Sequence, residues 1–205
     1  MKTVNFYYSI GSRYSYLAST QIDALKQATG CQVEWHPVNS ARLISQLESS
    51  PFEGKPVSTQ YEWTYRELDS QRWANLYGIP YLEPRGRVDF DSELLAQACT
   101  AAKYLGKVEE YSRLLFAAMF QEPLTKIDRQ ECRLRAEAVG MDAIDFQTAL
   151  RSPAIATQLT TTIDSAIRSG VFGVPTFIVD GEIFWGNDRL VLLQHYLELQ
   201  RDRHE

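Results

Sequence analysis

The two ends of the chain carry short apolar stretches that are typical of β-strands. Residues 4–8 are apolar and β-prone, and the segment CQVEWHPV follows at residues 31–38. Between them, helix-like periodicity runs over residues 15–28, and Gly30 follows as a helix-ending residue. This part of the chain therefore predicts a strand, a helix and a second strand.

Near the other end, the segment GVPTFIVDGEIFWG contains two β-prone runs joined by Asp180-Gly181. An Asp-Gly pair between two such runs is a strong signal for a β-hairpin. Residues 190–200 then show the pattern of a final helix. The C-terminal part thus predicts two antiparallel strands and a helix.

The segment between these ends is rich in helix formers and lacks comparable strands. Its amphipathic runs lie at residues 61–77, 92–105, 108–120, 130–139 and 142–150. Neither terminal part has enough strands to bury a sheet alone, so we expect the two parts to form one sheet. The prediction is a discontinuous α/β domain of residues 1–41 and 170–205, with residues 42–169 as an inserted helical domain.

Composition and charge limit the function. The chain has 205 residues, of which 44% are hydrophobic, and this is sufficient for a core. A net charge of −5, without a cluster of Lys or Arg, argues against nucleic-acid binding. Because no stretch is long and apolar enough to span a bilayer and no signal peptide is evident, we expect no membrane partner and a cytoplasmic location.

Cysteine spacing argues against a disulfide framework and against a metal site. Cys31, Cys99 and Cys132 are odd in number, far apart and in no CxxC or Cys/His arrangement. We therefore expect reduced thiols, mostly buried, and no bound metal.

A short polar motif stands where the first strand meets the first helix. Ser12-Arg13-Tyr14-Ser15 follows Gly11, and its two serines have the spacing of a redox dithiol but carry hydroxyls. Serine is also among the best helix N-cap residues, so a purely structural role for Ser12 stays open. Disulfide exchange by the protein itself is disfavoured, because two hydroxyls cannot form a dithiol.

Three segments together carry a family resemblance. FYYSIGSRYSYLAS (residues 6–19), YRELDSQRWANLYGIPY (65–81) and GVFGVPTFIVDGEIFWGNDRL (170–190) resemble the 2-hydroxychromene-2-carboxylate isomerases and kappa-class glutathione transferases, relatives of the DsbA oxidoreductases. The resemblance spans nearly the whole chain. It implies an α/β fold of the thioredoxin-like type with a large all-helical insertion, and glutathione as cofactor.

The resemblance also implies residue roles. Ser12 would hydrogen-bond the glutathione sulfur, Val174 before a cis-Pro175 would pair with its cysteinyl backbone, and Asn187 and Asp188 would bind its γ-glutamyl group. Lowering a thiol pKa by about two units takes roughly 2.7 kcal/mol. A hydrogen bond to a charged group gives about 1.5–3 kcal/mol, to which a helix N-terminus adds about 0.3–2 kcal/mol, so no cationic residue is needed. The alternatives to these ligand-binding roles are purely structural: Ser12, Asn187 or Asp188 would be a helix N-cap, and Pro175 would be a trans proline that starts a strand.

Two departures from the family pattern bear on ligand contacts. Arg13 stands where the family usually has proline, which hints at an anionic ligand, although a solvated arginine is the favoured interpretation. The family's lysine and asparagine after HPV correspond to Ser45 and Ser49, and Arg42 could supply the missing charge from about one helical turn earlier. Arg13, Ser15 and Arg42 are therefore candidate contacts of glutathione or substrate, with Ser15 more typical of an ordinary first-turn serine.

Histidine and aromatic residues add less. His36 ends the second strand and could reach the site, but a hydrogen-bonded structural role is favoured. Five aromatic residues are expected to lie mostly in the core, with one or two lining an aromatic-substrate pocket between the domains: Tyr61, Trp63, Tyr65, Trp73 and Tyr77.

The function predicted from these observations is glutathione-dependent cis/trans isomerisation of an unsaturated aromatic oxo-acid of the 2-hydroxychromene-2-carboxylate type. The thiolate would add to the conjugated alkene, allow rotation and leave again. A kappa-class-like glutathione transferase and a non-catalytic thioredoxin-fold binding protein are the alternatives. The partners expected are glutathione and a small aromatic substrate, and a homodimer is left open.

Overall fold

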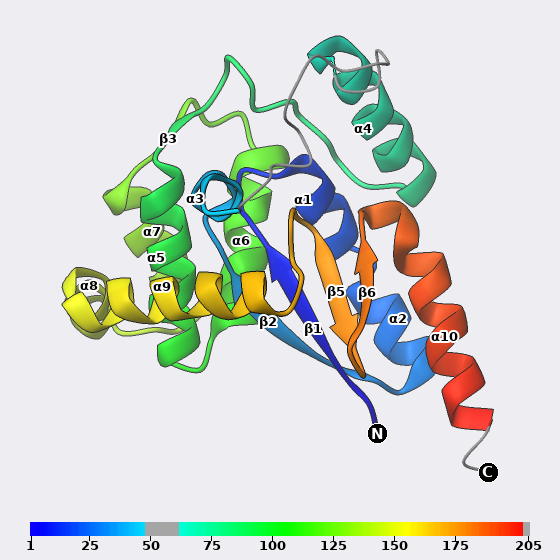
Figure 1. The fold of residues 1–205 in the computed structure, drawn as a ribbon. Coiled ribbons are helices and arrows are strands. Elements are labelled where there is room, and N and C mark those ends of the chain that lie inside the picture. Colours follow the sequence, from blue (N-terminus) through cyan, green and yellow to red (C-terminus); the bar gives the residue numbers. More distant parts are fainter. Residues whose placement is uncertain (48–61, 203–205) are drawn as a thin grey trace.

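A four-stranded mixed sheet built from both ends of the chain forms the centre of the molecule (Figure 1). The structure, a computed structural model, describes residues 1–47 and 62–202. The strand order is β2 (Gln32–Pro37), β1 (Thr3–Tyr8), β5 (Thr176–Val179) and β6 (Glu182–Trp185). β1 pairs parallel with β2 and antiparallel with β5, and β5 pairs antiparallel with β6. The predicted thioredoxin-like fold is confirmed.

Helices cover both faces of the sheet, which explains why β1 is almost entirely buried. Phe6 and Tyr8 point to one face and join a core cluster with residues of α2 (Ile22–Thr29), α6 (Val108–Phe120) and α10 (Leu190–Asp202). Tyr7, on the other face, joins a cluster with residues of α3 (Ser40–Ser45) and α9 (Pro153–Arg168). Side chains alternate across a strand, so two buried faces require a nearly continuous apolar run.

The residues between β2 and β5 are mainly helical, as predicted. Besides α3, α6 and α9, this part contains α4 (Trp63–Tyr77), α5 (Ser92–Tyr104), α7 (Arg129–Ala138) and α8 (Ala143–Arg151). It also contains two short parallel strands, β3 (Asp89–Phe90) and β4 (Lys126–Ile127), which the sequence did not predict. α4 lies at the end of the molecule opposite to both termini (Figure 1).

Several local predictions can be compared directly with the structure. The Asp180-Gly181 hairpin is confirmed: both residues have positive φ, 53° and 85°, as a type I′ turn requires. The single helix expected over residues 15–28 is instead divided into α1 (Arg13–Ser19) and α2. At the break, the hydroxyls of Ser19 and Thr20 donate to carbonyls within α1, so side chains compete with the helical hydrogen bonds.

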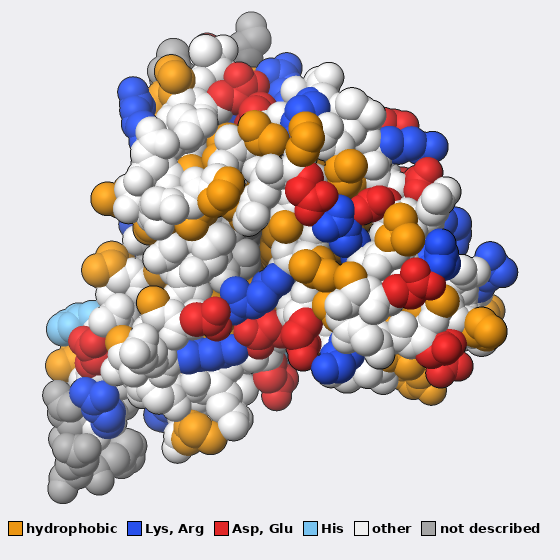
Figure 2. Space-filling view, turned by 180° about the vertical axis from the view of Figure 1, so that it is seen from behind, with side chains coloured by type: hydrophobic (Ala, Val, Ile, Leu, Met, Phe, Trp, Pro, Cys, Tyr) orange, Lys and Arg blue, Asp and Glu red, His pale blue; other side chains and the backbone are white. Residues whose placement is uncertain are grey.

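One core cluster extends across both predicted domains. The Phe116 ring of α6 lies 5.8 Å from the Tyr8 ring and 6.1 Å from the Tyr16 ring. The boundaries at residues 41/42 and 169/170 therefore stay a prediction. No described helix is long and apolar enough to cross a membrane. On the face shown in Figure 2, acidic and basic side chains are interspersed.

Candidate active site

The sheet register brings the two sequence motifs to the same end of the molecule. Tyr7 of β1 pairs with Thr176 of β5, so the residue before Thr176 lies beside the end of β1, just ahead of the Ser12 motif. The Val174-Pro175 peptide bond is cis, as predicted. The Pro175 carbonyl accepts a hydrogen bond from Gly186 N at 2.9 Å, which holds the following residues against this end. We call Ser12, Val174, Pro175, Asn187 and Asp188 the strand-end site.

Ser12 is the N-cap of α1. Its φ and ψ are −90° and 115°, and its Oγ accepts a hydrogen bond from Ser15 N at 3.2 Å. The hydroxyl proton is not used in that bond, and Ser12 is half-buried, so with respect to the described residues the O–H remains available to donate to a ligand. Ser15 differs, because it is fully buried and its Oγ accepts from Ser9 N at 3.4 Å.

Asn187 and Asp188 lie in a short 3₁₀ turn, η2 (Asn187–Arg189), that contacts α1. The buried Nδ2 of Asn187 has no hydrogen-bond acceptor of normal geometry among the described residues. Asn187 is nevertheless near Tyr77: burial raises the pKa of the Tyr77 hydroxyl, Asn187 lowers it, and the charge of Asp188 raises it further. Asp188 is exposed and pairs with Arg189 at 2.9 Å. The site thus offers an unsatisfied amide donor and an accessible carboxylate.

Arg13 is not solvated, so the favoured interpretation of this residue was wrong. Its side chain is only 9% exposed, and its Nη2 lies 2.9 Å from Glu83 Oε1. Its guanidinium carbon lies 5.1 Å from the centre of the Trp63 ring. Trp63 belongs to α4 and Glu83 to the segment after it, so contacts distant in sequence remove Arg13 from water.

Arg42 takes part in a different network. Its Nη2 donates to Thr160 Oγ1 at 2.7 Å and its Nη1 lies 3.4 Å from Glu93 Oε1, while Asn39 Nδ2 donates to Glu93 Oε2 at 2.8 Å. These bonds join α3 to α5 and α9. Among the described residues, none of its hydrogen bonds reaches the strand-end site. Ser45 is exposed, and Ser49 lies outside the described residues.

His36 is a structural residue, as favoured from the sequence. Its Nε2 is 2.8 Å from Asn5 Oδ1, its Nδ1 is 3.2 Å from Lys103 Nζ, and its ring stacks on Tyr7 at 4.8 Å. Burial, with a smaller contribution from the Lys103 charge, lowers the pKa of His36 to about 4. A neutral imidazole with both nitrogens engaged has no free group for catalysis near neutral pH.

The aromatic residues of α4 are less buried than predicted. Trp63 and Tyr65 are 48% and 40% exposed, and Trp73 and Tyr77 are half-buried, because α4 buries only Ser70 and Ala74. Tyr61 lies outside the described residues. A cavity of about 650 Å³ between β2, α5, α8 and α9 contains no residue of the strand-end site.

Protein thiols are unsuited to chemistry at this site. Cys31, Cys99 and Cys132 are free and buried, as predicted. Burial raises the pKa of Cys99 to about 12 and that of Cys132 to about 11. Both of these thiols are therefore protonated, and so poorly nucleophilic, near neutral pH.

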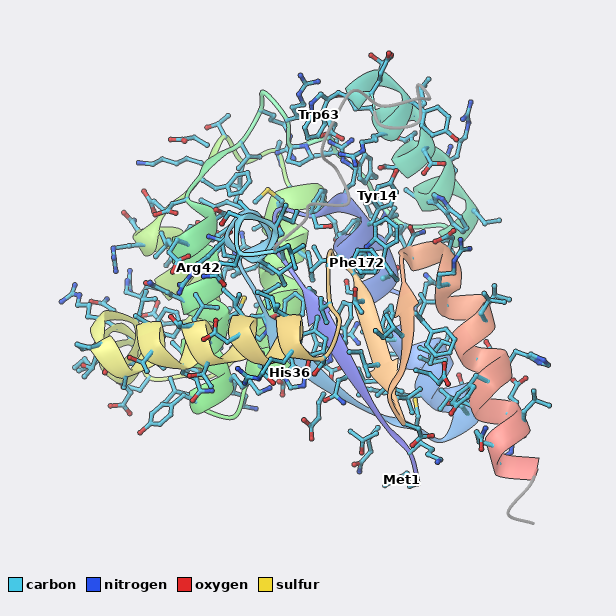
Figure 3. The ribbon with its side chains drawn as sticks, viewed as in Figure 1. Met1, Tyr14, His36, Arg42, Trp63 and Phe172 are labelled. Atoms are coloured by element: carbon cyan, nitrogen blue, oxygen red, sulfur yellow. The ribbon has the colours of Figure 1, made fainter. Side chains whose placement is uncertain are left out.

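Sequence reasoning missed several contacts around the strand-end site. Tyr77 approaches Asn187, Glu83 holds Arg13, and Phe172 packs on Trp185 with ring centres 4.9 Å apart. Tyr77 was one of the five aromatic residues considered for a substrate pocket, but its approach to Asn187 was not predicted, and no local signal marks Glu83, since both act on elements far away in the chain. Figure 3 shows Trp63 and Tyr14 toward the end of the molecule opposite to Met1, and Phe172 nearer to its middle.

Comparison with known proteins defines the class of protein. The sequence model of the DsbA-like thioredoxin domain family matches residues 3–198 of this chain, so the chain belongs to that family. Within it, a 2-hydroxychromene-2-carboxylate isomerase of Sphingobium xenophagum is 31% identical over 205 residues, covering 96% of this chain and 98% of the relative. Human glutathione S-transferase kappa 1 is 26% identical, covering 96% and 91%.

A solved structure agrees with these sequence matches. A 2-hydroxychromene-2-carboxylate isomerase structure superposes with a TM-score of 0.85 at 27% identity, covering 98% of this chain and 97% of the other. The resemblance predicted from the three motifs is therefore confirmed. The chain belongs with the isomerase and kappa-transferase relatives rather than with the dithiol oxidoreductases alone.

Proposed function

We propose that this protein is a glutathione-dependent isomerase that acts on an unsaturated aromatic oxo-acid of the 2-hydroxychromene-2-carboxylate type. Its named relatives are isomerases and a glutathione transferase, and the chain is accordingly an enzyme of this group. The single observation that carries the proposal is that the half-buried Ser12 hydroxyl, which donates to no acceptor among the described residues, lies at the same end of the sheet as the Val174-Pro175 bond.

The residues present fit glutathione. The Ser12 O–H would donate to its sulfur and favour the thiolate, since a hydrogen bond to a charged group is worth about 1.5–3 kcal/mol. The half-buried Val174 backbone would pair with its cysteinyl unit. The unsatisfied Nδ2 of Asn187 and the exposed carboxylate of Asp188 would bind the carboxylate and ammonium of its γ-glutamyl group.

Bound glutathione would supply the thiolate for addition, rotation and elimination at a conjugated double bond. The protein's own residues would orient the reactants, and the Ser12 O–H would donate to the sulfur, where the negative charge must be stabilised. Phe172, half-buried two residues before Val174, would pack against the aromatic ring of the substrate. None of these roles requires a protein cysteine.

A glutathione titration followed by calorimetry, and then product analysis, tests the proposal. We expect saturable binding, together with isomerisation of a 2-hydroxychromene-2-carboxylate-type acid that consumes no net glutathione. Net consumption of glutathione with an electrophile would instead favour the transferase. Absence of binding and of turnover would leave a non-catalytic thioredoxin-fold protein and refute the proposal.

A further inference from the structure

Arg13 carries a buried hydrogen-bond donor that the protein does not use. The side chain is 9% exposed, and Nη2 is paired with Glu83. Nη1, by contrast, is buried and has no acceptor among the described residues. A buried donor without a partner is costly and rare, so each such group calls for an explanation.

The carboxylate of Glu83 is already shared. Its Oε1 also accepts from Arg85 N at 3.1 Å, and its Oε2 accepts from the Tyr81 hydroxyl at 2.6 Å. The acid that neutralises the Arg13 charge therefore binds only one edge of the guanidinium. The second terminal nitrogen is left for another acceptor.

The surroundings of Arg13 hold its guanidinium in place. The Trp63 ring lies against it at 5.1 Å, and Arg85 lies over the same ring at 4.7 Å. Stacking on an aromatic ring and an ion pair to Glu83 restrict the fork to one orientation. A guanidinium fixed in this way is pre-organised to bind a planar carboxylate.

We propose that Arg13 is an anion-binding residue of the active site whose Nη1 takes a carboxylate of the bound ligands. Arg13 directly follows Ser12, so both residues stand at the start of α1, where the Ser12 hydroxyl would hold the proposed reacting sulfur. Assigning that carboxylate to the oxo-acid or to glutathione rests on the proposed function. The carboxylate chemistry itself rests only on the Arg13 contacts.

The test compares Arg13→Gln and Arg13→Lys with the wild-type protein. The probes are glutathione, 2-hydroxycinnamate as an aromatic acid, and its methyl ester as the neutral analogue, each titrated by calorimetry. We expect wild type to bind one carboxylate ligand tenfold to a hundredfold more tightly than Arg13→Gln does, with partial rescue by Arg13→Lys. If Arg13→Gln weakens binding of the acid but not of its ester or of glutathione, the carboxylate belongs to the substrate. If it weakens binding of glutathione alone, the carboxylate belongs to the peptide.

Arg135→Gln is a matched control. Arg135 is also largely buried, with a side chain 16% exposed, and pairs with Glu122 and Glu131. It lies on α7, well apart from α1 in Figure 1. We expect its loss to lower the melting temperature without changing the affinity for any of the three probes.

Two results would overturn the inference. One is Arg13→Gln binding glutathione and the acid as tightly as wild type does. The other needs no variant but adds the dimethyl ester of glutathione as a fourth probe: wild type would bind the acid no better than its ester, and glutathione no better than its diester. Failure of the proposed function would be seen in a different measurement. A wild-type protein that isomerises no substrate would refute the proposed function, whereas the preference for carboxylates is measured by binding alone.

Discussion

Ser12→Ala separates a catalytic hydroxyl from a helix cap. The substitution removes an Oγ that accepts from Ser15 N at 3.2 Å and, in the proposed function, donates to the ligand sulfur. The lost hydrogen bond to a thiolate, about 1.5–3 kcal/mol, corresponds to a rise of about one to two units in the pKa of the bound thiol. Losing the cap costs about 0.5–2 kcal/mol of folding free energy.

These two losses have different signatures. Below the pKa of the bound thiol, turnover should fall about tenfold to a hundredfold, and the defect should shrink as pH rises and solvent deprotonates the thiol. The cap loss should lower the melting temperature by a few degrees at every pH, by roughly 2–4 °C per kcal/mol for a chain of this size. The assay is a pH profile of glutathione-dependent turnover, with melting curves measured alongside.

Ser152→Ala is the matched control. Ser152 caps α9 through the same kind of bond, with its Oγ accepting from Ala154 N at 3.2 Å. We expect it to lower the melting temperature comparably and to leave turnover unchanged, while Ser12→Thr keeps the hydroxyl and most of the activity. Normal turnover of Ser12→Ala at every pH would show that Ser12 is only a cap, and a defect of constant size across the pH range would refute the pKa argument.

Three further predictions follow from particular contacts. Gly186→Ala should destabilise the fold by about 1 kcal/mol or more and weaken glutathione binding in calorimetry, because φ is 112° and a Cβ would collide with the Asp188 carboxylate. Between pH 6.5 and 4, His36 is protonated in the unfolded chain but stays neutral in the native protein, where its pKa is about 4. The free energy of unfolding measured in urea should therefore fall as the pH falls through this range, by about 3 kcal/mol at most from His36. His36→Gln should remove this contribution. Iodoacetamide at pH 8 should leave native turnover intact, because the pKa of Cys99, about 12, and that of Cys132, about 11, keep both thiols protonated; rapid inactivation would contradict this.

The sheet was predictable because its signals are local. The apolar runs of β1 and β2 and the Asp180-Gly181 turn each define an element without tertiary information. α9 also has a local signal, a Ser152 N-cap followed by Pro153 at the first helical position, but none of the predicted amphipathic runs covered it. β3 and β4 have only two residues each, too few for a pattern, and they form because Asp89 and Phe90 meet Lys126 and Ile127 in space.

The candidate site was predictable in its motifs but not in its environment. The Ser12 cap and the cis Val174-Pro175 bond follow from short segments. The burial of Arg13 does not, because it depends on Trp63 and Glu83, which the fold brings from beyond α1. Arg42 likewise seemed available from the sequence and is instead bound to Glu93 and Thr160 of other helices.

The charge balance at the start of α1 explains how a serine site differs from a dithiol site in the same fold. In a CxxC motif, nearby cations lower a thiol pKa. Here Arg13 is adjacent to Ser12 in the sequence, but its positive charge is paired with the Glu83 carboxylate, which lies 2.9 Å from Nη2. At a distance the two opposite charges largely cancel. What remains at the start of α1 is the Ser12 hydroxyl and an Arg13 Nη1 without an acceptor among the described residues, rather than a strong positive potential. Ser15 is buried with its Oγ bonded to Ser9 N, so no second group is poised to attack a ligand sulfur. In the proposed function, such a site would stabilise a thiolate and orient an acid without forming a disulfide, as isomerisation through a thiolate requires.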